Sequence, residues 1–129
     1  MRIAIVGGRD FVDFDLLEFK LRPYKASITL IVSGAAEGAD TLAQTYAKKY
    51  DIPFQDYPAN WDDLDVKPCK IKVNKLGNEY NVLAGFNRNQ KIVDSADFII
   101  AFWNSKSTGT RDTIGRANRA RKDTMIIYY

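Results

Sequence analysis

The sequence predicts an α/β fold in which a mostly parallel, five-stranded sheet lies between two layers of helices. Two observations carry this prediction. Short apolar runs alternate with helical patterns along the chain of 129 residues, as is typical of parallel β-α-β units. Three of the apolar runs also end in a glycine-bearing turn that leads into a helical pattern. Because the carboxyl ends of neighbouring parallel strands converge on one crevice, these turns are expected to meet there.

The first strand and helix are expected within the first 23 residues. Residues 2–6 form a short apolar run that ends at two glycines, which is typical of a buried strand. An amphipathic helix is expected to begin at Asp13 or Asp15 and to run to about residue 22. Pro23 marks its end, because proline is poorly tolerated inside a helix.

A second β-α-β unit follows. Residues 28–32 are rich in β-branched side chains and predict the second strand. Asp40 is expected to cap a helix that runs to residue 50, since aspartate side chains accept hydrogen bonds from the first helical N–H groups. A shorter third strand is expected over residues 53–57.

An insertion of about residues 63–81 separates this unit from the last part of the chain. The alternation in residues 70–73 and the pair Gly77-Asn78 predict a small hairpin within it. Connections of this length are commonly lids or binding loops, so both a lid and an assembly surface are open interpretations. After the insertion we expect a helix over residues 84–95, a strand over 97–102, a helix over 112–121 and a strand over 124–128. Residues 1–129 are expected to form a single domain.

The composition limits the chemistry. The chain has no histidine and one cysteine, which excludes a Ser-His-Asp triad, an internal disulfide and the common zinc sites, so no metal is expected. No apolar stretch approaches the roughly 20 residues that cross a membrane, and no secretory leader is visible. We therefore expect a cytoplasmic protein without a membrane partner. A net charge of +3 is modest for a dedicated nucleic-acid binder.

The glycine-bearing turns predict a site for a phosphate-bearing ligand. Small residues let a ligand approach the backbone, and N–H groups at helix starts attract anions. Arginine adds bidentate contacts to phosphate, and one arginine stands near the start of the helix that follows the insertion. The residues expected to bind the ligand are Gly7, Gly8, Arg9, Ser33, Gly34, Gly38, Arg88, Asn89, Ser107, Gly109 and Thr110.

Four further side chains have a predicted place near this ligand. Trp61 and Trp103 can stack on a base, although packing in the core or at an interface is the alternative for each. Glu37 and Asp40 are carboxylates within reach of the same crevice. They are weak candidates for a hydrolytic role, and capping is the alternative for Asp40.

Several motifs resemble one known superfamily. Residues 33–40 are similar to an S-G-x-A-x-G-[IA]-D turn, residues 88–92 to an R-N-x-x-[IM] helix start, and residues 107–114 to an S-x-G-T-x-x-x-I segment. Together they resemble the SLOG superfamily of Rossmann-like nucleotide-binding domains. The resemblance is greatest to the YspA/YpsA-related proteins of bacteria and phages. The superfamily also includes the DNA-processing DprA/Smf proteins and the Lonely-guy phosphoribohydrolases.

The resemblance implies binding of a nucleotide or a nucleotide-derived molecule, by a sensor or sequestering protein that needs no other cofactor and forms a homo-oligomer. The phosphoribohydrolases carry a catalytic glutamate three residues after the Gly-Thr pair, where this chain has Thr113. That difference argues against cleavage of an N-glycosidic bond, which remains one alternative function. Binding of single-stranded DNA, in the manner of DprA, is the other.

Overall fold

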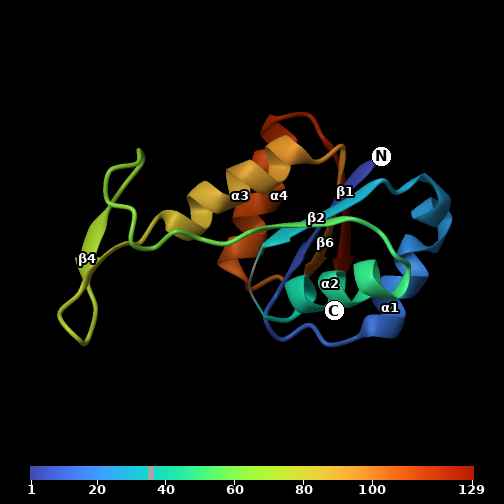
Figure 1. The fold of residues 1–129 in the computed structure, drawn as a ribbon, viewed down its shortest axis with the longest axis horizontal. Coiled ribbons are helices and arrows are strands. Elements are labelled where there is room, and N and C mark those ends of the chain that lie inside the picture. The colour runs from blue at the N-terminus through green and yellow to red at the C-terminus, as the bar shows by residue number, and fades with distance from the viewer. Residues whose placement is uncertain (35–36) are drawn as a thin grey trace.

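The computed structural model describes residues 1–34 and 37–129, and it contains the predicted parallel sheet (Figure 1). All strand pairs in this sheet are parallel, in the order β3-β2-β1-β6-β7. The fold-class prediction is therefore confirmed. The sheet comprises β1 (Arg2–Gly7), β2 (Leu30–Gly34), β3 (Phe54–Tyr57), β6 (Phe98–Trp103) and β7 (Asp123–Tyr128).

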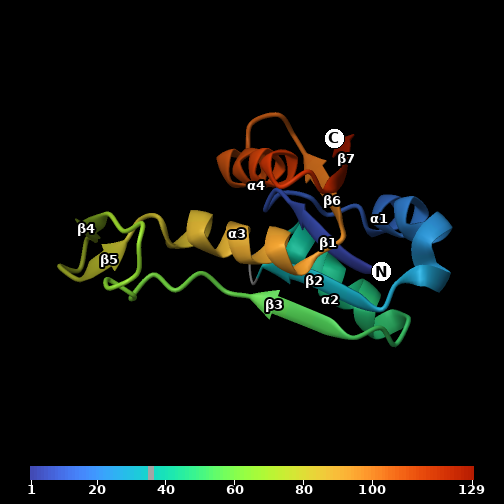
Figure 2. The same ribbon diagram turned by 90° about the horizontal axis from the view of Figure 1, so that it is seen from above.

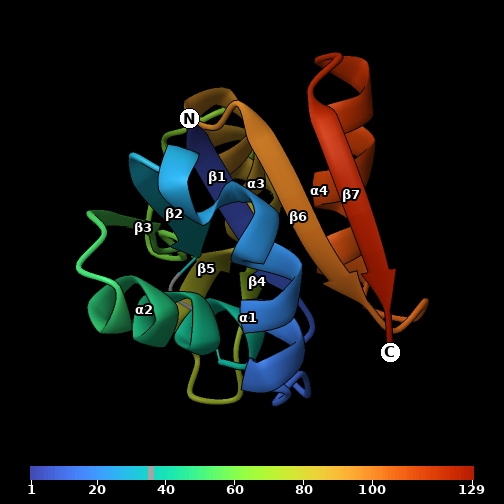
Figure 3. The ribbon, with the colours of Figure 1, turned by 90° about the vertical axis from the view of Figure 1, so that its right-hand side faces the viewer.

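Helices cover both faces of the sheet (Figure 3). Alternate residues of β1 point to opposite faces, so Ile3 and Ile5 pack under one helix pair and Ala4 and Val6 under the other. The first pair is α1 (Phe14–Leu21) with α2 (Ala39–Lys49), and the second is α3 (Ala84–Ser95) with α4 (Thr108–Arg119). In the part of the chain that the structure describes, no helix has the length and apolar character needed to span a membrane.

Two helix starts differ from the prediction. The first residue of α2 is Ala39, and the capping position belongs to Gly38, so the expected cap by Asp40 is wrong. Helix α4 begins at Thr108 rather than at residue 112, because the Ser107 side chain accepts a hydrogen bond from the N–H of Thr110. Both differences concern the predicted site, since Asp40 and Gly109 thereby lie in the first turns of helices.

The first helix matches its prediction more closely. The Asp13 carboxylate accepts a hydrogen bond from the Leu16 N–H at 3.0 Å and so caps α1. The helix ends at Leu21, and a 3₁₀ helix (Arg22–Ser27) with Pro23 in its first turn continues the chain.

The insertion between β3 and α3 contains the predicted hairpin. Its strands are β4 (Ile71–Val73) and β5 (Glu79–Asn81), which pair antiparallel. Figures 1 and 2 show that the hairpin projects beyond the amino-terminal end of α3, away from the five-stranded sheet. The sheet with its four helices is called the body below, and residues 58–83 are called the insertion.

Candidate ligand-binding site

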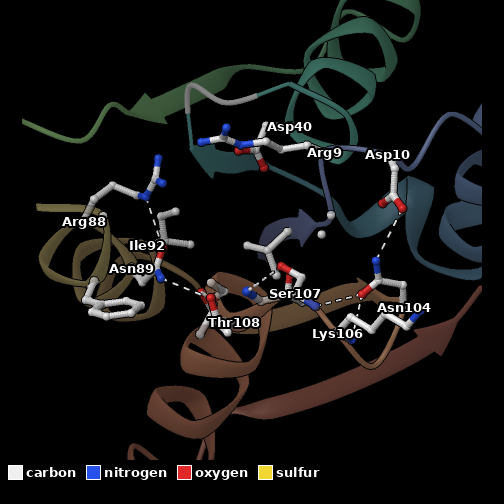
Figure 4. A pocket seen from close by; sticks show the side chains of 18 of the residues that line it. Arg9, Asp10, Asp40, Arg88, Asn89, Ile92, Asn104, Lys106, Ser107 and Thr108 are labelled. Atoms are coloured by element: carbon white, nitrogen blue, oxygen red, sulfur yellow. Dashed lines mark hydrogen bonds between the residues drawn. The ribbon is translucent and has the colours of Figure 1, made fainter. Parts of the chain in front are cut away.

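A cavity of about 630 Å³ opens at the carboxyl ends of β1 and β6. These neighbouring strands mark the point where the strand order changes direction, because the chain proceeds from β1 to β2 on one side and reaches β6 on the other. Ligands of doubly wound sheets bind at such a point. The turn after β1, the loop after β6 and the first turns of α3 and α4 line the cavity (Figure 4).

Glycine lets the first two predicted turns pack directly against each other. Gly38 has a φ of +76°, and a Cβ there would lie 2.3 Å from the carbonyl oxygen of Gly8. The N–H of Ala39 donates to that same oxygen at 3.3 Å. A Cβ on Gly7 would lie 2.7 Å from the Cβ of Ala39. Gly7 and Gly8 line the cavity, whereas Gly38 lies behind them and brings the second turn close.

Arg88 reaches the cavity from α3 as a half-buried cation. Its Nη1 donates to the carbonyl oxygen of Tyr57 at 3.2 Å, and its Nε donates to Oδ1 of Asn89 at 3.1 Å. Burial lowers the pKa of Arg88, the Asp40 carboxylate opposes that shift, and the positive charge of Arg9 adds to it. The guanidinium still remains protonated, because arginine does not lose its proton in proteins.

Arg9 extends from the turn after β1 toward the same end of the cavity as Arg88 (Figure 4). Its side chain is exposed, and no carboxylate among residues 1–34 and 37–129 forms an ion pair with it. Two guanidinium groups therefore share one end of the cavity with a single carboxylate, that of Asp40. This arrangement favours a bound anion.

The buried Ser33 hydroxyl fixes the position of that carboxylate. It lies 2.6 Å from the carbonyl oxygen of Ile5 and 2.7 Å from Oδ1 of Asp40. Asp40 lines the cavity, but Ser33 and Gly34 do not. A Cβ on Gly34 would lie 2.5 Å from Nη1 of Arg88 and 2.8 Å from Oδ2 of Asp40, so glycine makes room for both charged groups. Ala35 and Ala36 of the same predicted turn lie outside the described residues.

The amino-terminal end of α4 forms the opposite wall. The side-chain oxygen of Asn104 accepts hydrogen bonds from the N–H groups of Lys106 and Ser107, each at 2.8 Å, and thereby shapes the loop. No acceptor within the described ranges bonds the N–H of Thr108 or Gly109. A Cβ on Gly109 would meet nothing within 4 Å, so this helix start is open to a ligand.

Asn89 joins α3 to α4, and Thr113 forms a hydrogen bond within α4. Nδ2 of the buried Asn89 donates to the carbonyl oxygen of Gly109 at 3.3 Å and to Oδ2 of Asp112 at 3.1 Å. The Thr113 hydroxyl donates to the same carbonyl oxygen at 3.1 Å. Both side chains line the cavity while their polar atoms hold the helix start in place. Thr110 is buried beside them, with its hydroxyl 3.0 Å from that of Ser107.

The two tryptophans have different surroundings. Trp61 lines the cavity from the insertion and is 44% exposed. The Trp103 indole N–H donates to the carbonyl oxygen of Ser107 at 3.0 Å, and Trp103 is not among the lining residues. Phe86, which sequence reasoning missed, lines the cavity together with Trp61. The two rings supply the apolar contacts that a base would need.

The far end of the cavity carries a second missed group, Asp10. The Tyr129 hydroxyl donates to its Oδ1, and Nδ2 of Asn104 lies 3.4 Å from its Oδ2. The hydrogen bond from Tyr129 lowers the pKa of Asp10, while burial raises the pKa of Tyr129 to about 12, with the Asp10 contact adding to that shift. The other predicted carboxylate, Glu37, does not line the cavity. Within the described part of the chain, no group of acidic or cysteine side chains could hold a metal ion.

The amino-terminal part of the sequence is similar to one known family. Residues 1–63 match the model of the YspA, cpYpsA-related SLOG family. These residues are similar to that SLOG family. No curated protein matches the sequence of this chain.

Two solved structures share the fold. DNA processing protein A (DprA) from Streptococcus pneumoniae superposes with a TM-score of 0.73 at 22% identity, over 97% of this chain and 49% of that one. DNA processing protein A from Helicobacter pylori, described for its single-stranded DNA binding mode, gives 0.68 at 18% identity, over 98% and 64%. This chain thus spans less than two thirds of either relative.

Proposed function

We propose that this protein binds a nucleotide or a nucleotide-derived molecule in the cavity at the carboxyl edge of its sheet, as a sensor or sequestering protein. One observation carries the proposal. Arg9 and Arg88, which belong to different elements, face the cavity that also receives the unbonded N–H groups of Thr108 and Gly109. Cations and open helix N–H groups are complementary to phosphate.

The remaining lining residues suit the rest of a nucleotide. Trp61 and Phe86 offer ring faces to a base, and Asp40 offers a carboxylate to sugar hydroxyls. A volume of about 630 Å³ lies within the range of about 300–1,000 Å³ that small-molecule sites occupy. The ligand thus has its phosphate between the arginines and α4, and its base toward the insertion.

A hydrolytic enzyme is the less favoured function. At the position of the phosphoribohydrolase glutamate, Thr113 is buried and donates to the carbonyl oxygen of Gly109. Asp40 is the carboxylate beside the arginines, and its Oδ1 already lies 2.7 Å from the buried Ser33 hydroxyl.

Single-stranded DNA is a second candidate ligand. The Helicobacter pylori relative supports it, as do four lysines of the insertion: Lys67, Lys70, Lys72 and Lys75. Each phosphate that the protein neutralises releases counterions, and a strand has more phosphates than a mononucleotide. A binding affinity that falls steeply as the salt concentration rises would therefore favour a nucleic acid strand as the ligand.

Calorimetric titration with the four nucleoside 5′-monophosphates and with an unstructured 20-nucleotide strand tests the proposal. We expect Arg88→Met and Arg9→Met each to weaken mononucleotide binding at least tenfold. Arg119→Met, a matched loss of one exposed cation outside the cavity, should change it less than twofold.

Arg9→Met separates binding from folding, because Arg9 has no hydrogen bond or ion pair within the described residues. Binding that survives both cavity substitutions would contradict the proposal. Release of free base that Asp40→Asn abolishes would instead establish the hydrolytic function.

A further inference from the structure

A second cavity, of about 340 Å³, lies beside the first, along α3. The two cavities use adjacent faces of this helix. Residues 85, 86, 88, 89 and 92 line the first cavity, and residues 84, 87, 88, 90 and 91 line the second. Within the first set, residues 85, 88, 89 and 92 have the spacing of three and four residues that marks one face of a helix, and within the second, residues 84, 87, 88 and 91 do. Arg88 belongs to both sets and therefore forms the wall between the cavities.

The insertion supplies the outer wall of the second cavity. Asn60, Asp63, Lys67 and Pro68 line it from the insertion, opposite Lys91 of α3. Two hydrogen bonds hold this wall at the base of the insertion. Nδ2 of Asn87 donates to the carbonyl oxygen of Pro68 at 2.9 Å, and the N–H of Asn81 donates to the carbonyl oxygen of Trp61 at 2.7 Å. The same segment thus places Trp61 in the first cavity and builds the second.

Positive charge predominates in the second cavity. Lys67 and Lys91 form no ion pair with any described residue, and Arg88 has only neutral hydrogen-bond acceptors. Arg116 also lines the cavity, but its charge is already paired with Asp112 at 2.7 Å. Asp63 is the one acidic residue in the described lining. An anionic ligand group would balance this excess of charge.

Asn81 adds a buried hydrogen-bond donor without an acceptor. Its Oδ1 accepts from the N–H groups of Lys70 and Leu83 at 3.1 and 3.0 Å, which fixes the orientation of the amide. Its Nδ2 is buried and has no acceptor within the described ranges, and Asn81 lines the second cavity. Buried donors are almost always satisfied, whereas this group lacks the partner that is usual for a buried donor, in a residue that lines the second cavity.

We propose that the second cavity is a subsite for the second nucleotide of a dinucleotide whose first nucleotide occupies the cavity at the sheet edge. Arg88 contacts the phosphate that joins the two nucleotides, and Lys67 and Lys91 contact anionic groups of the second. The inference rests on the proposed function, because it requires a nucleotide in the first cavity. A dinucleotide is favoured over a longer strand because the other insertion lysines, Lys70, Lys72 and Lys75, line neither cavity.

Titration of nucleoside 5′-monophosphates against the corresponding 5′-phosphorylated homodinucleotides tests the subsite. We expect the dinucleotide of the preferred base to bind at least tenfold more tightly than its mononucleotide. The double variant Lys67→Ala/Lys91→Ala should lose this gain and keep its mononucleotide affinity within twofold. The control variant Lys72→Ala/Lys75→Ala also removes two positive charges, from residues of the insertion that line neither cavity. It should leave the affinities for mononucleotide and dinucleotide unchanged.

Each other outcome overturns the subsite. Equal affinity for mononucleotide and dinucleotide, or equal loss of both in Lys67→Ala/Lys91→Ala, would remove it while leaving the proposed function intact. Failure of every mononucleotide and dinucleotide to bind would overturn both proposals. A 5′-phosphorylated octanucleotide that binds far more tightly than the dinucleotide would assign the second cavity to single-stranded DNA.

Discussion

The body and the insertion contribute to the same cavity but are held together in different ways. In the body, Ile3, Ile99 and Ile100 are completely buried between the sheet and its helices. On the hairpin, Ile71 is 51% and Leu76 86% exposed. The body therefore depends on packed side chains, whereas the insertion depends on hydrogen bonds at its base. We therefore expect that the insertion can change without loss of the fold, although it shapes both cavities.

The largest effect on stability is expected at a glycine of the body, Gly38. It can be compared with Gly77 in the hairpin, because both residues have a positive φ. A Cβ on Gly38 would also overlap the backbone of Gly8 and Arg9, whereas a Cβ on Gly77 would meet nothing within 4 Å. We expect Gly38→Ala to lower the free energy of unfolding by about 3 kcal/mol or more, through strain and overlap together. Gly77→Ala should cost about 1 kcal/mol, through strain alone.

Urea unfolding followed by circular dichroism measures both glycine variants. Equal losses at the two positions would show that the contact between the first two turns does not constrain the body.

An intermediate effect is expected where the insertion meets the body. The side-chain oxygens of Asn81 and Asn74 each accept two backbone hydrogen bonds, but Asn81 is buried and Asn74 is exposed. Asn81→Ala should lower the free energy of local opening at Lys70 and Leu83 by about 2 kcal/mol, since their N–H groups lose a buried acceptor. In Asn74→Ala, water replaces the lost acceptor, and the cost should be about 0.5 kcal/mol.

Amide hydrogen exchange resolves this prediction by residue. The amides of β1 and β6 serve as the internal reference and should keep their protection in both variants. If protection of β1 and β6 fell as much as that of Lys70, the body and the insertion would unfold as one unit.

The smallest effect on stability is expected from an ion pair of the body, between Arg2 and Asp97. The hydrogen bond from Arg2 holds the pKa of Asp97 at about 2, below its ordinary 3.8, so folding favours the ionised carboxylate. Its contribution to stability should be complete above about pH 4 and should disappear as the pH falls through about 2. The Tm difference between wild type and Asp97→Asn should follow this course, which thermal unfolding between pH 2 and 7 can measure.

Asp65→Asn provides the control in the insertion, because Asp65 forms no ion pair with a described residue. A pH-independent difference for Asp97→Asn would show that the Arg2 contact does not contribute to stability in solution.

Local sequence patterns predicted most of the fold. Helix α3 has the predicted bounds, and the hairpin forms around the predicted Gly77-Asn78 turn, because periodicity and turn chemistry act over a few residues. The cap of α2 was wrong because Asp40 lies in the first turn of the helix, beside Ser33 and Arg88, and Gly38 occupies the capping position. That arrangement depends on contacts between separate elements, which no local pattern contains.

Only part of the cavity could be predicted from the sequence. Turns at the ends of neighbouring parallel strands must meet, so Gly7, Arg9 and Gly109 could be placed together from the sequence. Phe86 and Asn104 could not, because an aromatic residue in a helix and an amide in a loop have many ordinary roles. The inward direction of Ser33 depends on how β2 pairs with β1, a register that sequence alone left open.

The different surroundings of the two tryptophans also give the molecule an internal optical reporter. The indole of Trp61 lies in the cavity wall, while that of Trp103 is fixed to the backbone outside it, and the chain contains no other tryptophan. A bound base would alter the emission of the first ring and leave the second as a constant background. Fluorescence of the unlabelled protein can therefore follow occupancy of the cavity in real time, for ligands whose identity is not yet known.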